Sequence, residues 1–510
     1  MTTGVVDRHQ ADRQRVRKTR PLDGGTTHLL RSYRITTLGL LILFLALQFL
    51  IPARLVVSGM GAAGRPSVAL GILLAFLWAM AACRPKGLPA GRQPIRWVVA
   101  CYVAVQLATY AVGFDRGPTQ IEANSADRWL IFTIAMAGVV LAVCDGLATR
   151  RQLDLFLRVM VGLTATMATV GILQYMRIVN LVQYIKIPGL SANSQLLTGG
   201  SRGDGNFARI AGTANHYIEF GVVLALVLPI ALHYAFFAKP TPKSRFIAWL
   251  QVGLIAGAIP LSISRSAILT TGVALFLMLF VWKWRLRYNV MVIGAIGLVT
   301  FHFVNRGLLG TIWALFANVD NDPSIQNRLA DNATVFQLFQ SRPILGRGAG
   351  MIIPEQYLLL DNQFYVSLLA SGLVGVLSLS SLYLIPYFMA RSIRLRTPNE
   401  ADRHLAQALA ATFPAAMLAA GTFDAFSFAT YVGVLFALMG CVGALWRFTR
   451  GSVPKGTPEP LFWSPSDRLV CAPLMALNHQ RWYSPILRGV RACSASIATR
   501  STGGSRNQRP

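Results

Sequence analysis

The chain has 510 residues, of which 54% are hydrophobic and 13% are charged, and its mean hydropathy is +0.49. A soluble chain of this length needs more charged surface, so a set of soluble domains is excluded. The net charge is +28, but the cations lie in the tails and in short loops between apolar runs. That distribution sets orientation in a membrane and argues against nucleic-acid binding. The six cysteines show no metal-ligand spacing and imply no disulfide framework.

Residues 1–34 form a basic head that we expect to be disordered and cytoplasmic, because it is rich in arginine and poor in apolar residues. This head is longer than the basic head of a signal peptide, so the apolar run that follows is predicted to be an uncleaved first span. The head is either a topology signal alone or also a contact for anionic lipid.

Apolar runs of about 20 residues, the length that crosses a ~30 Å hydrocarbon core, recur along the chain. Residues 35–446 are therefore predicted to form an all-α polytopic membrane protein with about twelve transmembrane helices. The predicted spans are 35–52, 67–83, 96–114, 129–148, 155–176, 216–238, 245–262, 266–282, 288–304, 363–390, 404–421 and 426–446. Residues 447–510 form a basic tail without a full-length apolar run, and disorder is expected there.

Charge alternates along the chain between the predicted sides of the membrane. The loops after the second, fourth, sixth, eighth and tenth spans are rich in Lys and Arg, whereas the others are short or mix signs. Cation-rich loops mark the cytoplasmic side, so both termini are predicted to be cytoplasmic.

Two predicted outer segments are long, 177–215 and 305–362. Both are too polar to be lipid-exposed irregular chain, so they are expected to cover the bundle or line a water-filled cavity. In the second, apolar residues recur at helical spacing over 324–341, which predicts a helix lying on the membrane interface. The following GRGAG run is predicted to be a loop and not a dinucleotide fingerprint, because no strand precedes it.

Several polar residues at the predicted outer ends of the spans are candidates for chemistry. Arg265 lies in the short turn SISRSA, where it is either an anion clamp or a snorkelling side chain. Arg209 precedes the sixth span, and Asn215 is a candidate cap for that helix, whose N-terminus favours anions. A lone histidine such as His216 is more often structural than catalytic.

Asp361 and Asn362 stand where the long segment 305–362 enters the tenth span. Asp361 is either a base that accepts a proton from a hydroxyl or the helix N-cap, for which Asp and Asn are common. Asp424 lies in the outer turn between the last two spans and is either a second acid or a turn residue.

Four segments carry a further pattern: ARIAGTANHYIEFGVVLALVLPI, SISRSAILTTGVALF, NRLADNATVFQLFQSRPILGRGAG and DNQFYVSLLASGLVG. In this order they resemble the O-antigen ligase and polysaccharide polymerase superfamily of bacterial membranes, over about residues 200–390. The last segment is similar to the ligase signature of His, then Asn, Ser or Gln, nine residues, Gly, two residues and a closing Gly. Asn362, Gly372 and Gly375 keep that spacing, and Asp361 stands where the ligases have His.

The resemblance implies a GT-C-like fold in the bacterial cytoplasmic membrane, and transfer of a glycan on its outer face. The donor would be a glycan on a polyprenyl diphosphate, and the acceptor a sugar hydroxyl on another glycan or lipid-linked molecule. Asp361 would act as the base, and Arg265 and Arg209 would hold the diphosphate. Further substrate contacts are expected from polar residues of the same segments and of the last outer turn, Asn215, His216, Arg328, Arg347, Asn362 and Asp424.

Arginines are able to replace a metal as the counter-charge of the diphosphate, so no metal or other cofactor is expected. A second class of function, a lipid-linked glycan flippase or polysaccharide exporter, also fits about twelve spans. It is disfavoured because the spans are nearly free of cations, Arg158 being the main exception, and the halves of the chain do not look alike. A structural scaffold explains the topology but not Arg265. Ligase and polymerase are not separated by the sequence.

Overall fold

The computed structural model describes residues 36–192, 201–202, 207–238, 241–304, 307–317, 323–354 and 356–450. The side chains of 201–202, 304, 315 and 323–331 are not described. The basic head and residues 451–510 of the basic tail lie outside the described residues, so their disorder stays a prediction. All described residues belong to one unit, Met1–Trp463.

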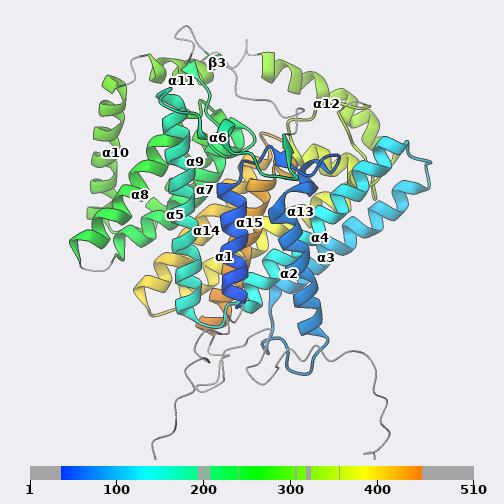
Figure 1. Cartoon of the computed structure of the whole chain (residues 1–510), viewed down its shortest axis with the longest axis horizontal. Helices are drawn as coiled ribbons and strands as arrows, with labels where there is room; N and C mark the ends of the chain where they lie inside the picture. Colours follow the sequence, from blue (N-terminus) through cyan, green and yellow to red (C-terminus); the bar gives the residue numbers. More distant parts are fainter. Residues whose placement is uncertain are drawn as a thin grey trace, which may run out of the picture. The chain divides into compact units, whose positions relative to one another are not determined.

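The described part of the chain is mostly helical (Figure 1). The helices that coincide with the predicted spans are α1 (Thr37–Leu50), α2 (Pro66–Ala82), α3 (Pro94–Phe114), α4 (Gln120–Gly146), α5 (Arg150–Tyr175), α7 (Tyr217–Phe236), α8 (Pro242–Leu261), α9 (Arg265–Leu279), α10 (Trp284–Val304), α13 (Gln363–Arg396), α14 (Glu400–Ala420) and α15 (Ala429–Thr449). Eight of these, α3, α4, α5, α7, α8, α10, α13 and α15, are long and apolar enough to cross a membrane. The all-α polytopic class is confirmed, and the number of twelve spans stays a prediction.

Several predicted helix ends are wrong where polar residues continue a helix. The largest difference is at α4, which begins at Gln120 and not at residue 129. Thr119 and Glu122 form a capping box there, and Glu122 Oε2 accepts the backbone N–H of Thr119 at 2.8 Å. At the other end of the chain, α15 continues to Thr449, so the predicted tail 447–510 begins inside a helix.

The centre of the bundle is made by α7 and α15, whose side chains are almost all buried. Helix α7 packs on α5, α8, α9, α14 and α15, and α15 packs on α3, α4, α5, α13 and α14. Oε1 of Glu219, in the first turn of α7, accepts the backbone N–H groups of Thr430 and Tyr431 in the first turn of α15. The starts of the two helices therefore lie together, and we call this end of the bundle the site end.

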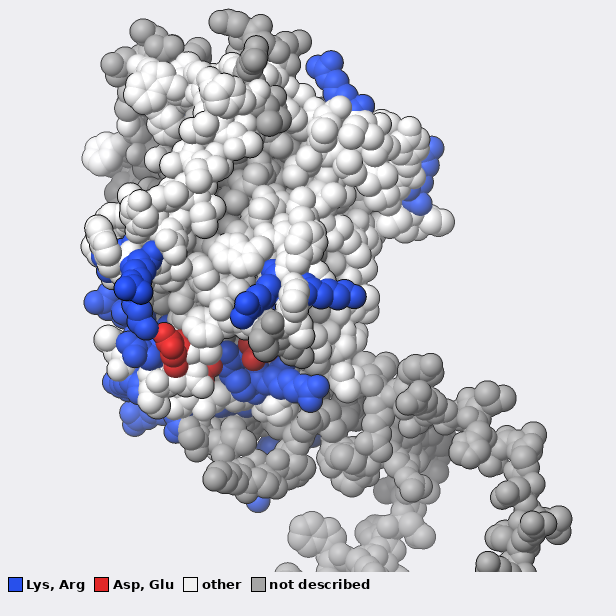
Figure 2. All heavy atoms as spheres, turned by 90° about the vertical axis from the view of Figure 1, so that its left-hand side faces the viewer, with Lys and Arg blue, Asp and Glu red and all other residues white. Residues whose placement is uncertain are grey.

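At the opposite end, the loops that are predicted to be cytoplasmic are joined by ion pairs. Arg150 at the start of α5 contacts Asp402 at the start of α14 at 2.9 Å, and Arg96 of α3 contacts Asp145 of α4 at 2.9 Å. Figure 2 shows Lys and Arg gathered in the lower half of one face, together with the few acidic side chains. We call this the basic end; its cytoplasmic location stays a prediction.

Short elements cover the site end. They are β1 (Leu55–Val56), η1 (Gly61–Gly64), α6 (Leu181–Tyr184), β2 (Ser191–Ala192), β3 (Ser201–Arg202), β4 (Phe207–Ala208), α11 (Leu308–Ala317), α12 (Pro323–Ser341) and η3 (Ala425–Ser427). Strand β1 pairs antiparallel with β2, Leu55 opposite Ala192, and β3 pairs with β4, Ser201 opposite Ala208. The predicted helix 324–341 is confirmed as α12, its interfacial position stays a prediction, and the sequence analysis missed α11.

The loop after α12 crosses α13 at a break in that helix. Gly372 has φ +64° and ψ −160°, and a Cβ there would lie 2.2 Å from the carbonyl oxygen of Ile344. The backbone N–H groups of Arg347 and Gly348 donate to the carbonyls of Leu369 and Ala370 at 2.9 Å. The predicted loop over GRGAG is thus confirmed, and the close crossing explains the glycine at position 372.

Candidate active site

The start of α7 brings His216 to the site end. His216 is the N-cap of α7, and its Nδ1 accepts the backbone N–H of Ile218 at 3.3 Å. The expectation that Asn215 caps this helix is therefore wrong; the backbone N–H of Asn215 instead donates to Oε2 of Glu219 at 2.8 Å. Because Nδ1 is an acceptor, the neutral ring carries its hydrogen on Nε2, which is left as a donor.

The charges around His216 show which predicted residues meet. Burial and the nearby Arg209 guanidinium lower the pKa of His216 to about 4, against the opposing effect of the Asp361 carboxylate. The imidazole is therefore neutral at neutral pH. Arg209 and Asp361, which come from two different loops, thus both lie near this ring.

Asp361 and Asn362 have separate places at the start of α13. Asn362 is the N-cap, and its Oδ1 accepts the backbone N–H of Phe364 at 2.9 Å. The cap is one of the two roles that the sequence left open for Asp361, and Asn362 fills it. Asp361 is half-buried and interacts electrostatically with both His216 and Asp424.

Asp424 precedes η3 in the turn between α14 and α15. Burial, together with the nearby Asp361 charge, raises the pKa of its carboxyl to about 7, although a hydrogen bond with Ser427 opposes the shift. Asp361 thus interacts electrostatically both with this carboxyl and with the neutral imidazole. A carboxyl group whose pKa is raised by burial and a nearby charge is typical of sites that move protons.

Arg209 is positioned by the ring next to His216. Its Nη1 donates to the hydroxyl of Tyr217 at 2.5 Å, and its guanidinium carbon lies 4.3 Å from the centroid of that ring. The ring centroids of His216 and Tyr217 are 4.0 Å apart. The guanidinium is therefore held against the Tyr217 ring, next to the His216 imidazole.

Two buried charged residues, Glu219 and Arg65, hold the loops of this cluster by hydrogen bonds, and neither was predicted from the sequence. Glu219 is fully buried and accepts three backbone N–H groups, those of Asn215, Thr430 and Tyr431. Arg65, also buried, donates from Nη1 to Oγ1 of Thr430 at 3.1 Å. An ionisable residue inside an apolar run is by itself a signal of function or of a buried network, and Glu219 gave that signal.

Arg265 is the first residue of α9, in the tight turn that the sequence predicts. A Cβ on Gly221 would lie 2.5 Å from Cβ of Ala267 and 2.6 Å from Oγ of Ser262, so this turn packs closely on the first turns of α7. Ile263 has φ +46°, a strained value for a β-branched residue. A cation at a helix N-terminus also opposes the helix dipole. Helix stability thus explains neither the strain nor the charge.

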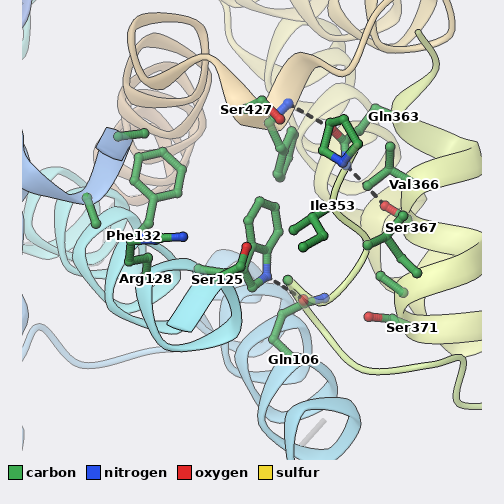
Figure 3. A pocket seen from close by; sticks show the side chains of 18 of the residues that line it. Gln106, Ser125, Arg128, Phe132, Ile353, Gln363, Val366, Ser367, Ser371 and Ser427 are labelled. Carbon is green, nitrogen blue, oxygen red and sulfur yellow. Dashed lines mark hydrogen bonds between the residues drawn. The ribbon is translucent and has the colours of Figure 1, made fainter. Parts of the chain in front are cut away.

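A cavity of about 260 Å³ opens beside the cluster between α3, α4 and α13 (Figure 3). Its lining combines the aromatic side chains of Trp129, Phe132 and Phe426 with amides and hydroxyls such as Gln106, Gln363, Ser367 and Ser427. Gln363 is held by the backbone N–H of Phe426 at 2.7 Å and by the hydroxyl of Ser367 at 3.3 Å. Aromatic faces among convergent hydrogen-bonding groups suit a polar organic ligand.

A second, smaller cavity lies beside the loop before α7 and shares a lining residue with the larger one. Asn215 and Arg65 line it together with Ser427, which also lines the larger cavity. The side-chain Oδ1 of Asn215 is buried and has no hydrogen-bond partner among the described residues. Asn215 thus lines a cavity and does not cap α7, and its substrate contact stays a prediction.

Arg347 contacts Tyr357 and Ser341, not Asp361 or Asp424, among the contacts described for its guanidinium. Its guanidinium lies over the ring of Tyr357 at 5.4 Å, and Nη1 donates to Oγ of Ser341 at 3.3 Å. The hydroxyl of Tyr357 in turn donates to Glu122 at 2.7 Å. The described contacts of Arg347 thus hold the loop onto α4. Arg328 belongs to α12, and its side chain lies outside the described residues.

The described residues do not bring three or more His, Cys, Asp or Glu side chains into a metal-binding group. Independence from metal stays a prediction.

Residues 250–380 match the model of a family described as O-Antigen ligase. The matched region includes Arg265, α12, the glycine crossing and Asp361, and the resemblance to the O-antigen ligase superfamily is confirmed. The match supports a membrane glycan-handling function of the O-antigen ligase or polymerase type, and glycosyl transfer with a lipid-linked glycan as partner is consistent with it. No curated protein matches the chain.

Proposed function

We propose that the protein transfers a glycan from a polyprenyl-diphosphate carrier to a sugar hydroxyl on the outer face of the bacterial cytoplasmic membrane. The observation that supports this most is the meeting of Arg209, His216, Asp361 and Asp424, from three separate loops, at the site end. A general base, a neutral donor and a cation together supply what a transfer from a diphosphate requires.

In the proposed reaction the acceptor hydroxyl oxygen attacks the anomeric carbon of the donor glycan. The bond between that carbon and the diphosphate oxygen breaks, and its electron pair leaves with the polyprenyl diphosphate. Asp361 takes the proton of the hydroxyl. His216 donates from Nε2 to an oxygen of the bound sugars, and Asp424, with its pKa near 7, is able to exchange a proton with the same region.

Arg209 and Arg265 are proposed to hold the diphosphate, because a guanidinium matches phosphate oxygens with two parallel N–H donors. The cavity between α3, α4 and α13 is proposed to bind the sugars. Trp129 would stack on a sugar ring, and the amides of Gln106 and Gln363 would orient its hydroxyls.

The test uses the full chain in lipid vesicles, supplied with a polyprenyl-diphosphate oligosaccharide and a glycan acceptor. Released polyprenyl diphosphate and elongated glycan are measured together. Asp361→Asn removes the base but keeps the shape, so the rate should fall by about 10²- to 10⁴-fold. Asp115→Asn, at an exposed carboxylate that ends α3, is the matched control and should leave the rate unchanged.

A rate for Asp361→Asn that stays close to that of the wild type would refute the role of Asp361. If the donor instead reaches the opposite leaflet without being consumed, the protein is a flippase or exporter, and the proposal of transfer is wrong. If transfer occurs, the length of the product separates a polymerase, which extends a repeat, from a ligase.

A further inference from the structure

A second polar cavity lies at the basic end, between the loop that joins α2 to α3 and the last turn of α15. Its volume is about 270 Å³, and four arginines line it, Arg92, Arg96, Arg447 and Arg450. None of the described residues that line it is acidic. Because α15 has 21 residues and rises about 1.5 Å per residue, this cavity is about 30 Å from the start of α15 at the site end. It is therefore separate from the candidate active site.

The inner wall of this cavity is rigidly built. Arg96 donates from Nε and Nη2 to the two oxygens of the buried Asp145, each at 2.9 Å, and the indole of Trp78 donates to Asp145 at 2.8 Å. Arg447 donates to the backbone carbonyls of Cys144 and Leu147, at the end of α4. Two guanidinium groups are thus fixed by hydrogen bonds before any ligand arrives.

The outer wall of the cavity is formed by exposed arginines, which add positive charge. Arg92 and Arg450 are exposed, and the guanidinium of Arg450 lies 3.6 Å from the centre of the Trp446 ring. The indole Nε1 of Trp446 is a buried donor with no acceptor among the described residues. Asp145 brings one negative charge to four positive ones, so the cavity offers donors and net positive charge together.

We propose that this cavity is a binding site for a phosphate group, independent of the transfer site. Guanidinium forks match phosphate oxygens, and the indole N–H of Trp446 supplies one more donor. Basic pockets between membrane helices at the cytoplasmic end hold anionic lipid headgroups, which makes a phospholipid one source of the phosphate. A soluble phosphate compound is the other source, and the experiment separates the two.

The experiment measures binding to the full chain in a nonionic detergent by isothermal titration calorimetry. The probes are a short-chain phosphatidic acid, the matching phosphatidylcholine and inorganic phosphate. The variant Arg92→Gln/Arg450→Gln removes two charges but leaves the bonds of Arg96 and Arg447 in place. Each cation near a membrane surface contributes about 1 kcal/mol, so affinity for the anionic probe should fall by about 10- to 30-fold.

The control variant is Arg151→Gln/Arg396→Gln, which removes two exposed arginines at the basic end outside the cavity. It should bind like the wild type. A separate change, Trp446→Phe, keeps a ring for Arg450 but removes the indole donor, and should weaken binding by about fivefold.

Binding of phosphatidic acid but not phosphatidylcholine, lost in the cavity variant alone, supports the proposal with a lipid as the source. Equal binding of inorganic phosphate with the same loss supports it with a soluble source. The proposal is overturned if no phosphate probe binds, or if the cavity variant binds as well as the wild type. Equal weakening by the two double variants would also overturn it, because surface charge alone would then explain binding.

Discussion

The carboxyl groups at the two ends of the bundle have opposite electrostatic surroundings. At the basic end, Asp145 accepts hydrogen bonds from Nε and Nη2 of Arg96 and from the indole N–H of Trp78. At the site end, Asp424 faces a second carboxylate, Asp361, and burial holds its pKa near 7. The basic end is arranged to stabilise charge, whereas the site end keeps a carboxyl group poised to gain or lose a proton at neutral pH.

This contrast separates structural charge from functional charge. The bidentate pair of Arg96 and Asp145 joins two helices through charged hydrogen bonds, which is a structural role. A carboxyl group whose pKa is raised by burial and a nearby negative charge, as at Asp424, reduces stability at higher pH, and proteins keep such groups mainly where chemistry needs them. The two ends should therefore respond differently to the same kind of substitution.

The largest effect on stability is expected for Asp145→Asn. It removes the counter-charge of Arg96, and breaking a buried pair from one side costs about 3–5 kcal/mol of unfolding free energy. The rate of transfer per folded molecule should not change, because the pair lies at the basic end. Thermal unfolding in detergent measures the first quantity and donor consumption the second. A lower rate per folded molecule, at unchanged stability, would contradict the division between the two ends.

Arg265→Ala should have the next largest effect, and on the rate alone. Removal of one group that stabilises the charge of a leaving group costs about 10²- to 10³-fold in turnover. Unfolding should shift less than for Asp145→Asn, since the N-cap, in which Ser264 Oγ accepts the backbone N–H of Ala267, is kept. Arg265→Lys is the control and should recover part of the rate through its charge. Equal losses in both variants would show that the planar fork is required.

The fold was predictable from the sequence where a single property dominates. Long apolar runs predicted the helices, because crossing a membrane sets their length. The start of α4 was missed because Thr119 and Glu122 are polar, and only their capping geometry shows that they continue the helix. Glu219 was overlooked because the run around it is otherwise apolar and was interpreted only as a span, although a charged residue in such a run is itself a signal.

The candidate site was predictable residue by residue but not as an arrangement. His216, Asp361 and Asp424 each stand at a predicted helix end, which the sequence gives directly. Their meeting depends on how α7 and α15 pack at their starts, and spacing along the chain carries no information on that. The choice of cap also needed the structure, because Asn215 and His216, like Asp361 and Asn362, are adjacent in sequence.

Glu219→Gln tests whether the buried network positions the site. The amide keeps one acceptor oxygen, so part of the contact with Asn215 or with Thr430 and Tyr431 is lost, at about 1.5–3 kcal/mol for a charged hydrogen bond. We expect kcat to fall by about tenfold, with KM nearly unchanged, because the loops of His216 and Asp424 shift relative to one another. A rise in KM at constant kcat would instead indicate a role in binding.

The smallest effect expected is a change in the pH dependence of stability. The pKa of Asp424 is raised from 3.8 to about 7 in the folded protein, so folding takes up a proton between these values. The free energy of unfolding contributed by this group therefore falls as the pH rises from about 4 to about 7. Asp424→Asn has no proton to bind, so it should gain stability relative to the wild type on going from about pH 5 to about pH 8.

His216 acts in the opposite sense, which makes it the internal check on this prediction. Its pKa is lowered from 6.5 to about 4, so the unfolded state binds the extra proton and stability rises with pH between these values. His216→Asn should therefore leave a steeper fall of stability with pH than in the wild type, whereas Asp424→Asn should leave only the rise that His216 causes. Unfolding temperatures of both variants at about pH 5 and about pH 8 separate the two groups. Parallel curves for Asp424→Asn and the wild type would show that the pKa of Asp424 is not raised in the folded protein, and the prediction would then be wrong.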